Sequence, residues 1–139
     1  MSSGIKPSAK CEATYKELKM DHCHRYILFK IVNNEIDVIK IAPRGETISQ
    51  FQDEVVKHQH TGCYGVLDYE CEGVKGSNLI YFSLVSDSAP LIARILHATT
   101  RMTLKSSFDG IKIDIEAHDI NELMEKLKTS SATDKRKIR

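Results

Sequence analysis

The stretch NLIYFSLVSDSAPLIARILHATTRMTLKSSFDG, residues 78–110, contains the clearest structural pattern in the chain. Its first part, residues 78–85, is apolar at almost every position, which predicts a strand buried on both faces and therefore central in a sheet. A helix follows, because Asp87 or Ser88 can cap it and Pro90 is tolerated in its first turn. No helix breaker occurs before Asp109-Gly110. The stretch thus predicts one buried strand followed by one long helix.

The predicted helix carries an apolar arc and a neighbouring row of cations. At about 100° per residue, one arc collects six side chains: Leu91, Ile92, Ile95, Leu96, Thr99 and Met102. Arg94, Arg101 and Lys105 fall in a narrow stripe beside it. A row of like charges is usually just the solvated face of a helix. Here the adjoining arc is apolar near the exposed start of the helix, which suits a helix that lies in an apolar groove of a partner with acidic margins.

The segments before this stretch predict two helices and three strands. A helix begins at Ser8, whose hydroxyl can accept from the first-turn amides, and runs to about Met20. Residues 25–32 and 35–41 form a β-hairpin around the Asn33-Asn34 turn. A capping box of Thr47 and Gln50 begins a helix that ends near His58, and residues 63–69 form a strand before an exposed loop over 70–77.

The segments after it predict a further strand and a last helix. Residues 111–115 alternate as a half-buried strand, and Asp119 with Glu122 caps a short helix. Strands therefore alternate irregularly with helices after an initial hairpin. This order predicts an α/β (α+β) domain in which helices cover the faces of a mixed sheet.

Composition favours one cytosolic globular domain. The chain has 139 residues, of which 41% are hydrophobic and 28% charged, and its net charge of +1 gives no overall attraction to nucleic acid. No apolar run is long enough to cross a bilayer, and the N-terminus does not resemble a secretory signal. The four cysteines lack a CxxC pair and are expected to be reduced thiols. We expect a domain over 1–128 and a polar, basic, flexible tail over 129–139.

One group of residues could in principle serve a metal or a thiol enzyme. Asp21-His22-Cys23-His24, with His58, His60 and Cys63, offers zinc ligands, and a cysteine nucleophile could meet a histidine base. Alternation along an extended segment would send Cys23 away from His22 and His24, and no usual ligand spacing occurs. Glycine-rich nucleophile or phosphate loops are missing from the sequence. We therefore expect that the protein binds no metal or cofactor and is not an enzyme.

The same helix carries a resemblance to a known family. SDSAPL at 86–91, Arg94 and ATTR at 98–101 resemble the opening of the long actin-binding helix of actin-depolymerizing factors and cofilins. Three other motifs stand in the family's order: SGI at 3–5, CYGVLD at 63–68 and FDGI at 108–111. The resemblance covers residues 2–128 and implies a single domain with a central mixed sheet of about five strands, flanked by helices. ELK at 17–19, HRYI at 24–27 and DGI at 109–111 resemble plant and protist members more than animal ones.

The resemblance implies residues for two actin contacts. The monomer contact would use Ser3, Gly4, Ile5, Arg94, Ile95, Arg101 and Lys105, and Ser3, with Ser2 as the alternative, would be the phosphorylated serine that switches binding off. The filament contact would use Lys75, Glu125 and Lys126. Three departures weaken the match. Ile92 stands where the family commonly has a basic residue, and the loop KGSN at 75–78 keeps only Lys75 of two basic residues. The last helix is short and offers Glu125, Lys126 and Lys128 in place of the family's charged cluster.

The implied function is therefore actin turnover. The chain is expected to be a monomeric protein of the cytoplasm and cytoskeleton that binds actin monomers and filaments, prefers the ADP-bound subunit, and promotes depolymerization and severing. Phosphoinositides are expected to compete with actin through the basic stripe. The alternative is a relative of the same fold, coactosin-like or glia-maturation-factor-like, that acts on filament sides or on the actin-related branching complex without severing.

Overall fold

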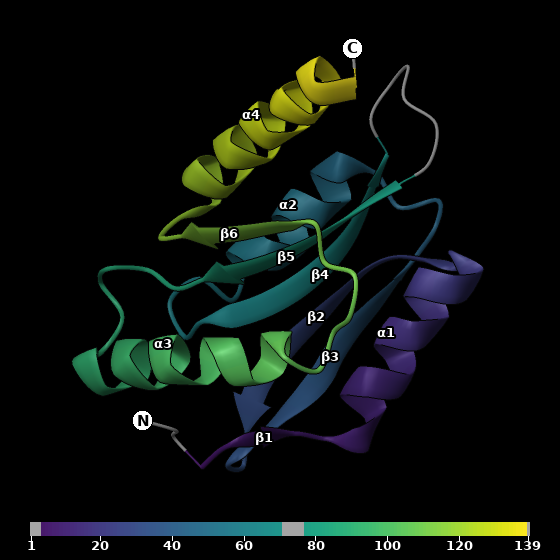
Figure 1. The fold of residues 1–139 in the computed structure, drawn as a ribbon. Coiled ribbons are helices and arrows are strands. Elements are labelled where there is room, and N and C mark those ends of the chain that lie inside the picture. The colour runs from purple at the N-terminus through teal and green to yellow at the C-terminus, as the bar shows by residue number, and fades with distance from the viewer. Residues whose placement is uncertain (1–3, 71–76, 139) are drawn as a thin grey trace.

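The fold is a six-stranded mixed sheet with two helices on each face (Figure 1). The structure is a computed structural model, and it describes residues 4–70 and 77–138. The elements are β1 (Lys6–Pro7), α1 (Ala9–Asp21), β2 (His24–Val32), β3 (Glu35–Pro43), α2 (Ile48–Val56), β4 (Cys63–Glu70), β5 (Ser77–Leu84), α3 (Leu91–Lys105), β6 (Ile113–Ala117) and α4 (Ile120–Ile138). The predicted fold class is confirmed. The short β1 is the one strand beyond those predicted.

The strand order is β1-β3-β2-β4-β5-β6. The neighbours from β3 through β5 pair antiparallel, whereas β1 pairs parallel with β3 and β6 pairs parallel with β5. Asn33 and Asn34 both have positive φ, 51° and 61°, as a two-residue hairpin turn requires, so the predicted hairpin is confirmed. The strand predicted to be central, β5, lies inside the sheet between β4 and β6.

Alternate residues of the strands build two cores. Tyr26 and Leu28 of β2 face α2 and α4, while Ile27 and Phe29 face α1 and α3. The first core is closed by Phe51, Val55, Leu123 and Leu127, and the second by Cys11, Tyr15, Leu18, Leu104 and Phe108. The side-chain period of two along each strand thus fixes which helices lie on which face.

The predicted starts of α2 and α4 are confirmed, because side chains form the predicted cap hydrogen bonds at both. The Thr47 hydroxyl accepts from the Gln50 amide (3.2 Å) and the Gln50 side chain accepts from the Thr47 amide (2.8 Å), which confirms this capping box. At the start of α4, Asp119 accepts from the Glu122 amide at 2.8 Å. The predicted short last helix is wrong, because α4 continues to Ile138. The flexibility of residues 129–139 stays a prediction.

Two predicted caps are wrong. Ser8 precedes α1, but its hydroxyl lies 3.5 Å from the Cys11 sulfur and 3.3 Å from Asp37 instead of bonding the first-turn amides. The helix α3 begins after Pro90, which occupies the cap position with an extended ψ of 142°. Ser88 cannot cap it, because Ser86 and Ser88 close a separate turn just upstream.

Candidate functional site

The outer face of α3 is apolar and open to solvent. Leu91, Ile92, Ile95 and Met102 are 61%, 80%, 53% and 57% exposed. Successive members are separated by one, three and seven residues, so all four lie on one side of the helix. Four large apolar side chains gathered on one helix differ from the scattered exposed residues of an ordinary surface, and such a patch marks an interaction site.

Two tyrosines from the sheet fix the orientation of α3. The Tyr64 hydroxyl of β4 donates to the His97 carbonyl at 2.6 Å, and the Tyr81 hydroxyl of β5 donates to the Arg101 carbonyl at 2.8 Å. These bonds are one helical turn apart and originate from neighbouring strands. Because the helix is held at two points along its inner side, its apolar outer face has a fixed position.

His97 packs beneath the helix as a neutral ring. It is 5% exposed and stacks on Tyr64 with ring centroids 4.2 Å apart. Burial lowers the pKa of His97 to about 4, and its Nε2 has no hydrogen-bond partner in the described part of the chain. Gly62, at φ 91°, is required beside it, since a Cβ there would lie 2.8 Å from the His97 Nδ1. Sequence reasoning missed this histidine, although His97, Thr100 and Leu104 share the helical spacing of a buried face.

The predicted row of cations is not a uniform charged stripe. Asp114 of β6 pairs with Arg101 and, at 2.9 Å, with Lys105. Arg101 also lies 3.6 Å from Glu116, and its Nε donates to the Ser83 hydroxyl at 2.9 Å. These two cations are therefore largely neutralised from within the chain.

Arg94 differs from the other two cations. Its Nε donates to the Ala89 carbonyl at 3.1 Å, and among the described residues it forms no ion pair. Among Arg94, Arg101 and Lys105, Arg94 is therefore the cation without an ion-pair partner in the described part of the chain.

The N-terminal segment lies next to α3. β1 contacts α3 and pairs with β3, so Lys6–Pro7 lies beside this helix (Figure 1). Ile5 is 6% exposed and belongs to the core, so its side chain anchors this segment and does not offer a surface contact. Gly4 is exposed, with φ 80°. Ser3 lies outside the described residues.

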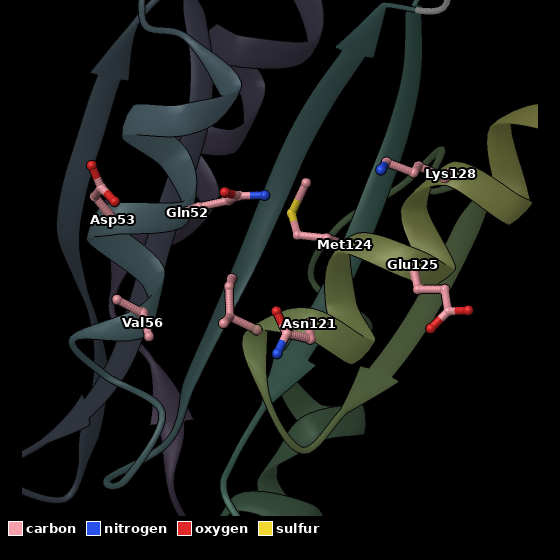
Figure 2. Close-up of a pocket in the computed structure, with 8 residues that line it drawn as sticks. Gln52, Asp53, Val56, Asn121, Met124, Glu125 and Lys128 are labelled. Atoms are coloured by element: carbon pink, nitrogen blue, oxygen red, sulfur yellow. The ribbon is translucent and has the colours of Figure 1, made fainter.

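The residues predicted for a filament contact belong to a different part of the molecule. Glu125 lines a groove of about 700 Å³ between α2 and α4, together with Gln52, Val56 and Met124 (Figure 2). Lys126 instead reaches β6, where its Nζ donates to the Glu116 carbonyl at 2.8 Å. α4 covers the sheet face opposite α3. Lys75 lies outside the described residues.

The residues considered for metal or thiol chemistry are mostly separated. His58 pairs with Glu54, His60 with Ser88, and His22 with the buried Asp68. Burial raises the pKa of the Cys63 thiol to about 12, so this cysteine stays a neutral thiol at neutral pH and is no nucleophile.

One part of that prediction is wrong. Cys23 and His24 do not point apart, because His22 takes the left-handed conformation and Cys23 precedes the strand, so the alternation of an extended segment does not apply. Asp68 also pairs with Arg44 at 2.8 Å, an ion pair that no pattern in the sequence predicted.

Comparison with known proteins identifies the family. The family described as cofilin/tropomyosin-type actin-binding protein matches residues 4–131, nearly the whole chain. The chain belongs to the ADF/cofilin family. Actophorin of Acanthamoeba castellanii is 28% identical over 127 residues, covering 88% of this chain and 91% of actophorin. Cofilin of Schizosaccharomyces pombe is 29% identical over 125 residues, covering 87% and 89%.

Solved structures of ADF/cofilin proteins agree with the fold. The cofilin of Streptomyces griseoflavus superposes with a TM-score of 0.83 at 25% identity, covering 94% of this chain and 98% of that one. The human coactosin-like protein has a TM-score of 0.73 at 14% identity, covering 94% and 89%, which shows the shared fold alone. The ADF/cofilin resemblance inferred from the motifs is thus confirmed, while the individual roles of the site residues stay predictions. None of the helices in the described part of the chain is long and apolar enough to span a membrane.

Proposed function

We propose that this ADF/cofilin chain binds actin through the exposed apolar face of α3. The observation that carries the proposal is the exposure of Leu91, Ile92, Ile95 and Met102 on a helix held rigidly by Tyr64 and Tyr81. A preformed face loses little conformational entropy on binding, so its apolar area contributes efficiently to affinity. Arg94 supplies a charged margin, and the segment around Gly4 lies beside it.

The proposed activity is filament turnover driven by binding alone. The chain binds monomers and filaments, holds the ADP-bound subunit more tightly than other states, and so shifts the polymer equilibrium toward depolymerization and severing. Differential affinity supplies the energy, and no bound cofactor or catalytic residue takes part. The protein would act as a monomer in the cytoplasm, on the cytoskeleton.

Two forms of regulation belong to the same proposal. A phosphate on Ser3 would add about −1.5 to −2 charges to the N-terminal segment and weaken binding. Phosphoinositides would compete with actin at the cationic side of α3. With Arg101 and Lys105 paired to Asp114, that competition would depend mainly on Arg94.

Titration of labelled ADP-actin monomers with the purified chain tests the monomer contact. Saturable binding with one chain per actin supports it, and a flat titration contradicts it. A Ser3→Glu variant should bind more weakly, while Ser130→Glu, a matched change on α4, should bind as the wild type does.

The filament contact is proposed to be weaker than the monomer contact. KGSN at 75–78 keeps one basic residue, and each lost rim ion pair would cost about 0.2–1 kcal/mol. Introducing Gly76→Lys and Asn78→Lys should therefore tighten filament binding and make it more salt-sensitive. If the wild type and the double variant bind filaments with equal affinity and equal salt dependence, the missing basic residues do not weaken the filament contact.

The alternative is a coactosin-like or glia-maturation-factor-like relative that does not sever. It shares the fold, as the superposition with the human coactosin-like protein illustrates. Filament binding without release of subunits would favour the coactosin-like activity. Binding to the actin-related branching complex, with actin itself unaffected, would favour the glia-maturation-factor-like activity.

A further inference from the structure

Three potential metal ligands meet where α1 joins β2. Glu17 comes from the last turns of α1, Cys23 from the connection, and His24 from the first position of β2. Their ligand atoms all lie within 4.8 Å of one another, and the His24 Nε2 is 3.3 Å from a Glu17 carboxylate oxygen. This cluster lies apart from the apolar face of α3, at the end of α1 that points away from that helix (Figure 1).

The backbone builds this cluster independently of any ligand. His22 ends α1 in the left-handed conformation, at φ 52°, and its amide donates to the Leu18 carbonyl at 3.1 Å. The chain therefore turns back on the helix, which brings the Cys23 sulfur to 3.8 Å from the Glu17 carbonyl. Arg44 fixes the other side, because its guanidinium donates to the His24 carbonyl at 3.1 Å.

We infer that Glu17, Cys23 and His24 form a binding site for Zn²⁺. One thiolate sulfur, one imidazole nitrogen and one carboxylate oxygen are the donors that this borderline-soft ion takes, whereas Mg²⁺ and Ca²⁺ require oxygen. With zinc bonds of about 2.0–2.3 Å, ligand atoms around a tetrahedral ion lie about 3.3–3.8 Å apart. Small rotations of partly exposed side chains bring the three atoms to that spacing.

Charge balance supports the dication. Binding releases the thiol proton of Cys23 to solvent, moves the imidazole proton of His24 from Nε2 to Nδ1, and exchanges the hydrogen bond between His24 and Glu17 for two bonds to the metal. The thiolate and the carboxylate then carry two negative charges, which offset the charge of the ion. A water molecule completes the fourth position. The site ties the end of α1 to the start of β2, so zinc should raise the melting temperature without altering α3.

Metal titration of the reduced full-length chain tests the site. We expect one Zn²⁺ per chain, measured by competition with a chromophoric chelator. Cys23→Ser and His24→Asn should each weaken binding at least about tenfold, since even outer-shell partners of metal ligands are worth 10–100-fold. Co²⁺ as a probe should give a thiolate charge-transfer band that Cys23→Ser abolishes.

Two matched variants complete the test. Cys63→Ser and His60→Asn remove the same chemical groups elsewhere, Cys63 at the start of β4 beside Leu84, and should retain zinc affinity and the cobalt band. Melting curves without metal establish that every variant is folded. The inference is overturned if the wild type fails to bind Zn²⁺, if Cys23→Ser binds it unchanged, or if Cys63→Ser or His60→Asn loses it.

Discussion

Replacing Ile92 by alanine should weaken actin binding while leaving the fold intact. The change removes three carbon atoms from a side chain that is 80% exposed. At about 0.8 kcal/mol for each buried methylene, complete coverage by actin would make the loss about 2 kcal/mol, or about 30-fold in Kd. Half coverage would give about 1 kcal/mol, or about fivefold. The free energy of unfolding should hardly change, because the side chain packs against little in the free protein.

Fluorescence titration of labelled actin monomers measures this effect against a matched control. Met20→Ala shortens an equally apolar side chain, 72% exposed on α1, and should leave the Kd unchanged. Urea unfolding of both variants checks that stability is retained. A Kd for Ile92→Ala within twofold of the wild type would show that α3 does not present its apolar face to actin.

Three further predictions concern the surroundings of α3 and the sheet beneath it. Burial lowers the pKa of His97 from 6.5 to about 4, so as the pH falls this histidine is protonated in the unfolded chain before it is protonated in the folded one. The free energy of unfolding should therefore be highest above pH 6.5 and fall by about 3 kcal/mol toward pH 4. Urea unfolding measured against pH should show a smaller fall for His97→Gln. Gly65→Ala should cost about 1–3 kcal/mol, since its Cβ would overlap the Phe82 ring, and an unchanged urea midpoint would count against this packing. Asp114→Asn frees two cations of α3, so actin affinity should become more salt-dependent; equal slopes of log Kd against log salt would show that the ion pairs do not mask them.

Local patterns in the sequence carried much of the fold. Asn33-Asn34 predicts its turn because few residues accept two successive positive φ angles. Thr47 and Gln50 predict a helix start because each bonds the other's backbone. The apolar arc of α3 was equally visible, since helical spacing alone places Ile92 and Ile95 on one side. These three features depend on neighbours in sequence and were predictable, whereas the Ser8 side chain bonds the distant Asp37 and its predicted cap was wrong.

Features that depend on distant partners were not predictable. Periodicity showed the row of Arg94, Arg101 and Lys105 but could not show that Asp114, on a later strand, neutralises two of them. The alternation of an extended segment also predicted that Cys23 and His24 point apart. That prediction failed because alternation holds only within a strand, and the left-handed His22 interrupts the extended backbone. Such pairings follow from tertiary structure, which a local pattern does not contain.

Cosedimentation with preformed actin filaments is the decisive test of the proposed actin contact, with the chain measured in the pellet and actin in the supernatant. We predict that actin moves to the supernatant as the chain is added, with little chain pelleted, because α3 carries the proposed monomer contact while the stretch KGSN at 75–78 contains one basic residue. If neither the distribution of actin nor that of the chain changes, the apolar face of α3 serves another partner.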